Sequence, residues 1–498
     1  MVTINQLQDH EEKSITLKGW VYNIRSSKKL HFIELRDGTG ICQCIVTEGE
    51  VSSDVWEMAS SLKQESSLEI TGMVVKDERS IGGYELRVSD LAIYQVAEEY
   101  PITPKEHGVE FLMENRHLWL RSRKQWAVMR IRNRIVYALH QFFQERDFMQ
   151  LDAPIFTGNA AEGTSTLFET DFFDENAYLT QSGQLYAEAM AMAHGKVYTF
   201  GPAFRAEKSK TRRHLSEFWM IEPEMAFYDL EMNMDLAEAM IKYIVREVLE
   251  RGGDELGIIG RERYYLEQAY KNPFHRITYD KAVEVLTGSE TDQLLQKMVQ
   301  DRESEQKELN LELNKIKTEH GSAKKWRKSQ IDQRIREIHT RQNQIEEDLR
   351  NIPEWRESAR NFEWGSDFGG SDETLLTMQY NAPVFVHRYP AAVKAFYMKR
   401  DPENDRLALA MDLLAPEGYG EIIGGSQREE SLEELQKRIR EHNLSEDLFR
   451  WYLDLRRYGT VPHSGFGLGL ERTVSWICGL SHVRETIPFP RMLGRLTP

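Results

Sequence analysis

The chain has few cysteines and no long apolar run, and each of these absences argues against a class of protein. Its three cysteines, Cys42, Cys44 and Cys478, form no CxxC pair and no zinc-like spacing, which argues against a disulfide scaffold and a structural zinc site. No apolar stretch reaches the ~20 residues that a transmembrane helix needs. The first residues lack the basic and then apolar pattern of a secretory signal. We therefore expect a cytoplasmic protein with reduced thiols and no membrane partner.

Positive charge is also scarce relative to negative charge. The net charge of −16 at pH 7 argues against a nucleic-acid-binding surface that covers the whole protein. Local basic patches remain at Lys28-Lys29, at Arg121 to Lys124 and at Lys208 to Arg213, so RNA binding is still possible. With 498 residues, the chain is long enough for two or three domains.

Residues 1–97 have the pattern of a small all-β domain. A helical pattern at Val51 to Lys63 separates the third and fourth of five strand patterns, as is typical of an OB-fold barrel. Such barrels bind single-stranded nucleic acid on aromatic platforms beside basic side chains. Phe32, Arg25 and Gln43 fit that function, although composition alone favours a core position for Phe32. The expected strands are Ile15 to Ile24, Leu30 to Arg36, Ile41 to Val46, Ser67 to Val75 and Tyr84 to Ala92.

Residues 98–114 carry two prolines and are predicted to be a linker to a larger region, 115–498. This region mixes helical and strand patterns, so we expect an α+β fold. It begins with a predicted long helix, Arg116 to Arg146, and a strand-like segment, Phe148 to Phe156. Pro154 favours an edge position for that strand, which is a natural place for a dimer interface.

A highly charged segment within this region predicts an inserted helical hairpin at about 290–360. Leucine and isoleucine recur at helical spacing in two runs, with a break at His320 to Ser322. Two antiparallel helices of about 40 Å would satisfy this pattern at 1.5 Å per residue. A solvated structural arm and a specific binding role are both possible for this hairpin.

Val197 to Glu224 predicts a β-hairpin with a basic loop. Alternate residues of a strand face the same side, so one face of this hairpin presents Arg205, Glu207 and Phe218. These side chains offer a phosphate clamp, an acceptor for an exocyclic amine and a stacking surface, which a purine nucleotide requires. The alternative is a basic hairpin without a ligand.

Three segments in order along the chain resemble the motifs of the class II aminoacyl-tRNA synthetases. Pro154 resembles the first motif, FRAE (204–207) with RHLSEF (213–218) resembles the second, and GLGLER (467–472) resembles the third. The N-terminal barrel is similar to that of the subgroup that charges aspartate, asparagine and lysine. The segments SGQLYAE (182–188), GEIIGGSQREE (420–430) and IPFPR (487–491) most resemble the bacterial asparaginyl members.

The resemblance implies an antiparallel sheet core flanked by helices and a site for ATP as substrate with Mg²⁺. Arg205, Glu421 and Arg472 would be catalytic, and Glu421 would also be the Mg²⁺ ligand. His463 either lines the site or is a hydrogen-bonded structural histidine. The resemblance implies the following ATP-binding residues: Arg205, Glu207, Arg213, His214, Leu215, Phe218, Glu421, Gly469 and Arg472.

The same resemblance implies an amino-acid pocket formed by Glu162, Ser182, Gln184, Glu188, Gly424 and Arg428. Aspartyl members carry a lysine where Ala187 stands here. Because Glu188 follows, a carboxylate substrate is disfavoured by like-charge repulsion. Glu188 would accept from the carboxamide NH₂ of asparagine, and Arg428 would donate to its oxygen. The implied function is therefore an asparagine–tRNA ligase.

The resemblance further implies a homodimer and a tRNA partner whose anticodon contacts Arg25, Phe32 and Gln43. Three alternatives remain open: a non-discriminating aspartyl-tRNA synthetase, an ammonia-dependent asparagine synthetase on the same core, and a non-catalytic RNA-binding paralogue. Trp364 to Leu376 follows the family pattern only loosely, so we assign this segment no role.

Overall fold

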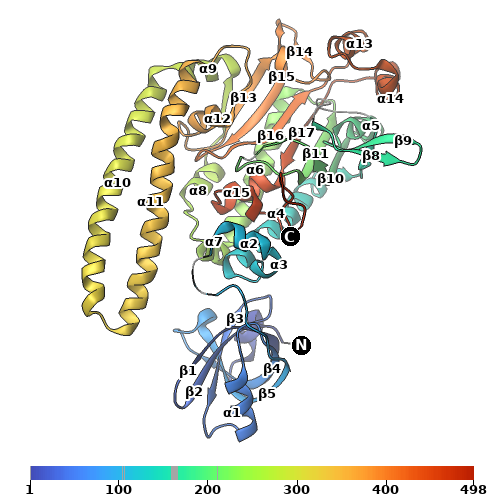
Figure 1. Ribbon diagram of the computed structural model, residues 1–498. Coiled ribbons are helices and arrows are strands. Elements are labelled where there is room, and N and C mark those ends of the chain that lie inside the picture. Colours follow the sequence, from blue (N-terminus) through green and yellow to red (C-terminus); the bar gives the residue numbers. More distant parts are fainter. Residues whose placement is uncertain (1, 104, 106, 159–165, 210, 498) are drawn as a thin grey trace. The chain divides into compact units, whose positions relative to one another are not determined.

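The computed structural model describes residues 2–103, 105, 107–158, 166–209 and 211–497. The chain divides into two compact units, Met1–Ser122 and Arg123–Pro498 (Figure 1). Each unit has its own hydrophobic core. No helix among the described residues is both long and apolar enough to span a membrane.

The first unit contains a closed five-stranded barrel in the order β1-β2-β3-β5-β4, which confirms the predicted OB-fold. Inward residues alternate with outward ones; Ile33 and Leu35 of β2 and Cys42 and Cys44 of β3 are fully buried. A short helix between β3 and β4 also matches the expectation. The elements are β1 (Ser14–Ser26), β2 (Leu30–Arg36), β3 (Ile41–Thr47), α1 (Ser53–Ser61), β4 (Ser67–Lys76) and β5 (Tyr84–Gln95).

The long helix predicted for 116–146 is interrupted. The structure has α2 (Val109–Glu114), α3 (Arg116–Trp119) and then α4 (Arg123–Gln144). Between α3 and α4, the amides of Arg121 and Ser122 donate three residues back, to Leu118 and Trp119, and this tighter turn ends the helix. The apolar periodicity indicates which face of the helix is buried, but it contains no information about this local turn.

The second unit is built on a nine-stranded sheet, in the order β12-β13-β15-β16-β17-β11-β10-β6, with β14 paired to β15. Its central pairs are antiparallel, as expected, whereas β12–β13 and β6–β10 at the two edges are parallel. The strands are β6 (Met149–Gln150), β10 (Lys196–Phe204), β11 (Glu217–Ala226), β12 (His275–Thr278), β13 (Val384–Pro390), β14 (Arg400–Asp401), β15 (Asn404–Ala415), β16 (Gly420–Gln427) and β17 (His463–Gly469).

Helices cover this sheet and form the larger core with it. Val128, Ile131 and Ile135 of α4 are fully buried, which confirms the apolar face predicted there. Their partners include Met240 and Ile244 of α6. The helices are α5 (Gln184–His194), α6 (Leu230–Arg251), α7 (Gly253–Ile259), α8 (Tyr264–Lys271), α9 (Tyr279–Thr287), α12 (Gly370–Thr377), α13 (Leu432–Glu441), α14 (Arg450–Arg457) and α15 (Leu470–Cys478).

The strand predicted for Phe148 to Phe156 is shorter than expected. It is divided into β6 and β7 (Phe156–Thr157), and Pro154 lies between them, where its missing N–H interrupts no ladder. β7 belongs to a small separate sheet in the order β7-β9-β8, with β8 (Glu169–Phe172) and β9 (Glu175–Leu179).

Two long helices, α10 (Ser289–Ser322) and α11 (Lys325–Arg360), form the predicted hairpin, which projects from the sheet in Figure 1. Each is roughly 50 Å long at 1.5 Å per residue. In α11 a heptad repeat of buried residues faces α10: Ile331, Ile338, Ile345, Ile352 and Ala359. The turn follows Ser322, slightly later than the predicted break.

Candidate active site

The β10–β11 hairpin forms one wall of a cavity of ≈ 730 Å³. Ala203 pairs with Phe218, and from Phe218 onward every second residue of β11 faces the ligand space. Phe218, Met220, Glu222 and Glu224 all line either this cavity or a smaller recess that adjoins it. One face of a single strand therefore runs from an aromatic end to an acidic end.

The recess has the features expected of a nucleotide-binding site. The guanidinium carbon of Arg205 lies 5.6 Å from the centre of the Phe218 ring. Arg472, from α15, donates through Nη1 to the backbone oxygen of Glu421 at 3.1 Å and to its carboxylate at 3.0 Å. Leu215 and Gly469 complete the recess, so all these predicted residues are brought together.

Arg213 and His214 also line the cavity, and Arg213 is held by several acceptors. Arg213 donates to the Glu373 carboxylate at 3.0 Å, to the Thr374 hydroxyl at 2.6 Å and to the backbone oxygens of Gly370 and Gly418. Burial, followed by the nearby Arg472, lowers the pKa of His214, so the neutral imidazole is favoured.

Glu207 is not brought to the cavity wall. It lies beyond the end of β10, and its carboxylate is 3.5 Å from His214 Nε2. The structure thus joins Arg205 with Phe218, as the hairpin geometry predicted, but it separates Glu207 from them. The reason is that the pairing between the two arms continues only to Arg205, whose amide donates to Ser216 at 3.0 Å. The next amide, Ala206, donates to Thr166 at 2.8 Å, so the period-two alternation no longer applies at Glu207.

Three carboxylates converge on the floor of the cavity: Glu373, Asp412 and Glu421. Burial, and then the charge of Glu421, raises the pKa of Glu373 to about 7. Burial also raises the pKa of Asp412 to about 6, although Lys394 donates to it at 2.9 Å. Burial opposes ionisation of Glu421 too, but Arg472, Lys394 and Arg205 lower its pKa overall.

Ser182 and Gln184 line the opposite end of the cavity, as predicted. They stand at the start of α5, and Glu222 fixes this turn by accepting from the Ser182 hydroxyl and from the Gly183 amide at 2.8 Å. Gly424 of β16 lies across from them, where a Cβ would approach the Glu421 carboxylate to 2.9 Å.

Arg428 and Glu224 form a buried ion pair at this end. Arg428 Nε and Nη2 donate to the two oxygens of Glu224 at 3.0 and 2.9 Å, and Nη1 donates to Ser426 at 2.7 Å. Both charged side chains line the cavity. Gly465 of β17 passes directly beside Glu224, and a Cβ there would collide with its carboxylate. The pair therefore presents unused donors and acceptors to a ligand from a fixed position.

Glu188 lies behind this pair and does not line the cavity, which corrects the direct contact predicted for it. Its carboxylate accepts from Gln184, from Tyr452 at 2.7 Å, from Arg456 at 2.8 Å and from His463 at 2.9 Å. With these partners in place, little of its acceptor capacity remains for a substrate amide. His463 is fully buried and belongs to this network, so it is a structural histidine.

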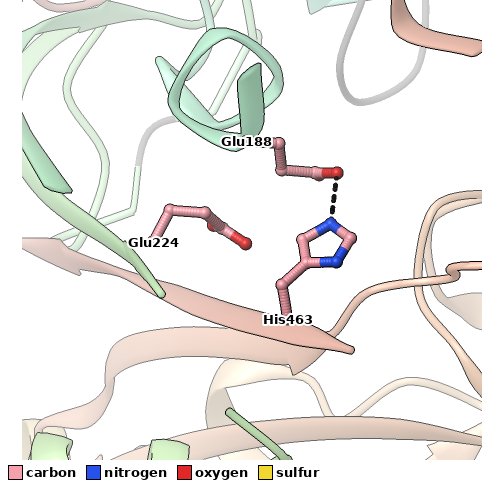
Figure 2. Close-up of side chains that lie close together, drawn as sticks. All are labelled: Glu188, Glu224 and His463. Atoms are coloured by element: carbon pink, nitrogen blue, oxygen red, sulfur yellow. Dashed lines mark hydrogen bonds and ion pairs between the residues drawn. The ribbon is translucent and has the colours of Figure 1, made fainter. Parts of the chain in front are cut away.

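Figure 2 shows Glu188, Glu224 and His463 with their ligand-type atoms close together. These atoms lie within 4.8 Å of one another, as in a metal site. However, Arg428 and Arg456 already neutralise the two carboxylates. Two guanidinium groups at this distance would repel a divalent cation, so we interpret the cluster as an ion-pair network and not as a metal centre.

Of the remaining predicted residues, Glu162 lies outside the described residues. Arg25, Phe32 and Gln43 share the outer face of the barrel: Arg25 pairs with Phe32 across β1 and β2, and Gln43 stands on β3. Phe32 is half-buried and points away from the core, because its neighbours Ile33 and His31 are the inward residues. The core position favoured by composition is therefore wrong.

Several residues that line the cavity were not predicted from the sequence, among them Glu224, Glu373, Asp412 and Lys394. A signal existed for Glu224, because period-two alternation from Phe218 places it on the ligand face. The structure also gives a role to the segment to which we assigned none, since Glu373 lies in it. No local pattern distinguishes Asp412 or Lys394 from other strand and turn residues.

The chain matches two known families. Residues 108–493 match the family of tRNA synthetases class II (D, K and N), and residues 15–94 match the OB-fold nucleic acid binding domain. The chain is 51% identical over 498 residues to the asparagine–tRNA ligase of Symbiobacterium thermophilum and 50% identical over 499 residues to that of Sorangium cellulosum, covering 100% of this chain and 99% of each relative.

Solved structures agree with these matches. The asparaginyl-tRNA synthetase from Pyrococcus horikoshii, complexed with asparaginyl-adenylate, superposes with a TM-score of 0.83 at 37% identity, covering 100% of this chain and 99% of that one. The family matches account for both units of the chain, and the relatives extend over its whole length. The chain therefore belongs to the asparagine–tRNA ligases, within the class II tRNA synthetases for aspartate, lysine and asparagine.

Proposed function

We propose that the protein activates L-asparagine with ATP, releasing pyrophosphate, and then transfers the asparaginyl group from the adenylate to the 3′ end of its tRNA. One observation carries this proposal: the recess with Arg205 and Phe218 is continuous with a cavity that ends in the buried Arg428–Glu224 pair. Such a cavity can hold a nucleotide and a small carboxamide next to each other.

The first step forms a bond between an asparagine carboxylate oxygen and the α-phosphorus and breaks the bond to pyrophosphate. The protein supplies position and positive charge instead of a covalent intermediate. Phe218 stacks on the adenine, Arg472 packs from the other side, and Arg205 binds the α-phosphate and the attacking carboxylate. Arg213 and His214 bind the outer phosphates.

Mg²⁺ fits the carboxylate floor of the cavity. Glu373, Asp412 and Glu421 offer hard oxygen donors. Burial, and after it the charge of Glu421, raises the pKa values of Glu373 and Asp412, and a bound cation would favour their ionised forms. When bound there, the ion would supply positive charge for the phosphate oxygens. Glu421 was the ligand expected from the sequence, and the geometry adds Glu373 and Asp412 to the proposed set.

Asparagine is recognised by a donor and an acceptor held side by side. Three of the five N–H groups of Arg428 donate to Glu224 and Ser426, which leaves donors for the carboxamide oxygen. The Glu224 carboxylate accepts from the carboxamide NH₂. An aspartate side chain would place a second carboxylate beside Glu224, and this repulsion disfavours it. Glu188 acts indirectly by supporting this pair, and Glu162 is assigned to bind the α-ammonium group.

The barrel is proposed to bind the tRNA anticodon through Phe32, Arg25 and Gln43. The half-buried Phe32 ring on the outer face supports this assignment, because stacking on a base needs an accessible aromatic face. We retain the division into an anticodon-binding domain (1–97), a linker (98–114) and a catalytic domain (115–498).

A homodimer is proposed on the basis of an exposed aromatic patch on the small sheet. Phe156, Phe172 and Phe173 are 49%, 45% and 91% exposed, and Phe172 contacts both of the others. Contiguous apolar surface of this kind marks protein interfaces. Three free cysteines support the proposed cytoplasmic location.

The proposal is tested by ATP–pyrophosphate exchange with asparagine or aspartate as the amino acid. We expect exchange with asparagine only. Exchange with aspartate alone would refute the substrate assignment, equal exchange with both would indicate a relaxed enzyme, and no exchange with either would favour a non-catalytic RNA-binding protein.

A further inference from the structure

Two consecutive arginines of the β10–β11 loop, Arg212 and Arg213, contact different helices. Arg213 enters the cavity and is held by α12 and by the backbone of Gly418. Arg212 instead forms an ion pair with Glu347 of α11, in the inserted hairpin. The Arg212 backbone oxygen also accepts from the Val483 amide at 3.0 Å. The loop that contributes Arg213 and His214 to the cavity lining is therefore attached to the inserted hairpin.

The hairpin is stiff enough to act as a fixed support. Besides its buried heptad seam, arginines of α11 at seven-residue intervals pair with glutamates of α10. These pairs have N–O distances of 2.6 to 2.7 Å and are Arg327–Glu319, Arg334–Glu312 and Arg341–Glu305. Such a ladder fixes the register of the two helices and hence the position of Glu347.

The base of the hairpin is joined to the wall of the same cavity. Ser358 of α11 donates to Asp372 of α12 at 2.9 Å. The next residue, Glu373, is the acceptor of Arg213. The hairpin thus contacts the loop through Arg212 and the helix that anchors Arg213.

We propose that Glu347 is a positioning residue for the reaction: through Arg212 it holds the loop so that Arg213 and His214 stay in place for ATP. This inference rests on the proposed function, which assigns ATP to this cavity. Without the ion pair, part of the free energy of ATP binding would be used to order the loop. The KM for ATP should therefore rise, while the kcat at saturating ATP stays unchanged.

The test compares Glu347→Gln and Glu347→Arg in asparagine-dependent ATP–pyrophosphate exchange, with Glu346→Gln as matched control because Glu346 is exposed. A half-exposed ion pair shifts an equilibrium by about two- to fivefold, which is the rise in KM expected for Glu347→Gln. Repulsion from Arg212 should increase it to about tenfold in Glu347→Arg. The control should change KM by less than about twofold, within the range of ordinary surface substitutions.

A charge swap keeps the inference falsifiable. The double variant Arg212→Glu with Glu347→Arg should recover most of the lost ATP affinity, which a merely destabilised fold would not do. An unchanged KM for ATP, additive effects in the swap, or a change confined to the KM for tRNA would each overturn the inference. If the unaltered chain shows no asparagine-dependent exchange, the proposed function itself fails, which is a separate result.

Discussion

Glu224 and Arg428 are the two residues on which selection of asparagine depends in our proposal. Both are buried, they bind each other through two hydrogen bonds, and both face the cavity. Burial, opposed by Arg428, raises the pKa of Glu224, and the nearby Glu188 adds to that rise. Removing the charge of Glu224 would leave the buried guanidinium of Arg428 without its counter-charge, which is strongly unfavourable.

We expect Glu224→Gln to lower kcat/KM for asparagine by about 10²-fold or more, because a buried charged acceptor is lost. The ratio of aspartate to asparagine exchange should rise, since Arg428 would be released to pair with a substrate carboxylate. Exchange kinetics with both amino acids measure the effect. Glu217→Gln on the same strand, outside the cavity lining, is the control. An unaltered asparagine KM would remove Glu224 from the pocket.

Glu373 should make stability depend on pH. Its pKa is raised from 4.5 to about 7, so the folded chain holds this proton more tightly than the unfolded chain does. Without Mg²⁺ and nucleotide, stability should therefore fall as the pH rises from about 4.5 to 7. Glu373→Gln should abolish this dependence of stability on pH. It should stabilise the chain by up to about 3 kcal/mol at pH 8 and by little at pH 4.5.

Denaturant titrations of both proteins at the two pH values measure that difference. A second readout is the Mg²⁺ concentration needed for exchange. In the unaltered chain it should decrease between pH 6 and 8, because deprotonation frees the carboxylates at about pH 6 and 7. A flat Mg²⁺ requirement would argue against Glu373 and Asp412 as ligands.

At the scale of elements, the outer face of β2 and β3 is the proposed anticodon surface. Phe32→Ala should raise the KM for tRNA about ten- to hundredfold, since one stacked base contributes about 1–3 kcal/mol. Exchange without tRNA should be unaffected. Tyr94→Ala, a comparable exposed aromatic substitution on β5, is the control. Equal losses for both variants would indicate a general defect of the barrel.

The elements also show how far periodicity predicts structure. The five barrel strands and the two hairpin helices were predicted close to their observed bounds, because their alternation or heptad pattern repeats many times. The helix predicted for 116–146 and the strand predicted for 148–156 were wrong in detail. Both errors arise where a short segment, a tight turn at 120–122 and an irregular stretch at 151–155, interrupts the regular element.

At the scale of the whole molecule, the aromatic patch on the small sheet predicts self-association. Replacing Phe173 and Phe156 by aspartate should convert a dimer into a monomer, because it places charges on the apolar contact. Sedimentation equilibrium measures the change, and thermal melting of the monomer checks that it is folded. If the unaltered chain already sediments as a monomer, the dimer proposal fails.

The sequence was sufficient to predict the reaction class and four residues of the recess in which we propose that the nucleotide binds. The three motifs follow each other in order, and Arg205, Phe218, Glu421 and Arg472 are local features of those motifs. The structure brings these four residues to one recess, as expected. Such residues can be predicted because each motif carries its own strand, turn or helix pattern, so that their side-chain directions follow from nearby sequence.

The fold was needed to show which acidic residue faces the cavity in which we propose that the amino acid binds. The sequence analysis named Glu188 and missed Glu224. Tyr452 and Arg456, which follow Glu188 by 264 and 268 positions, pack onto Glu188 and occupy its oxygens. Glu224 instead lies where β11 passes Gly465 and reaches Arg428. Contacts between segments so far apart leave no periodic trace in the chain, so the fold had to identify the acceptor.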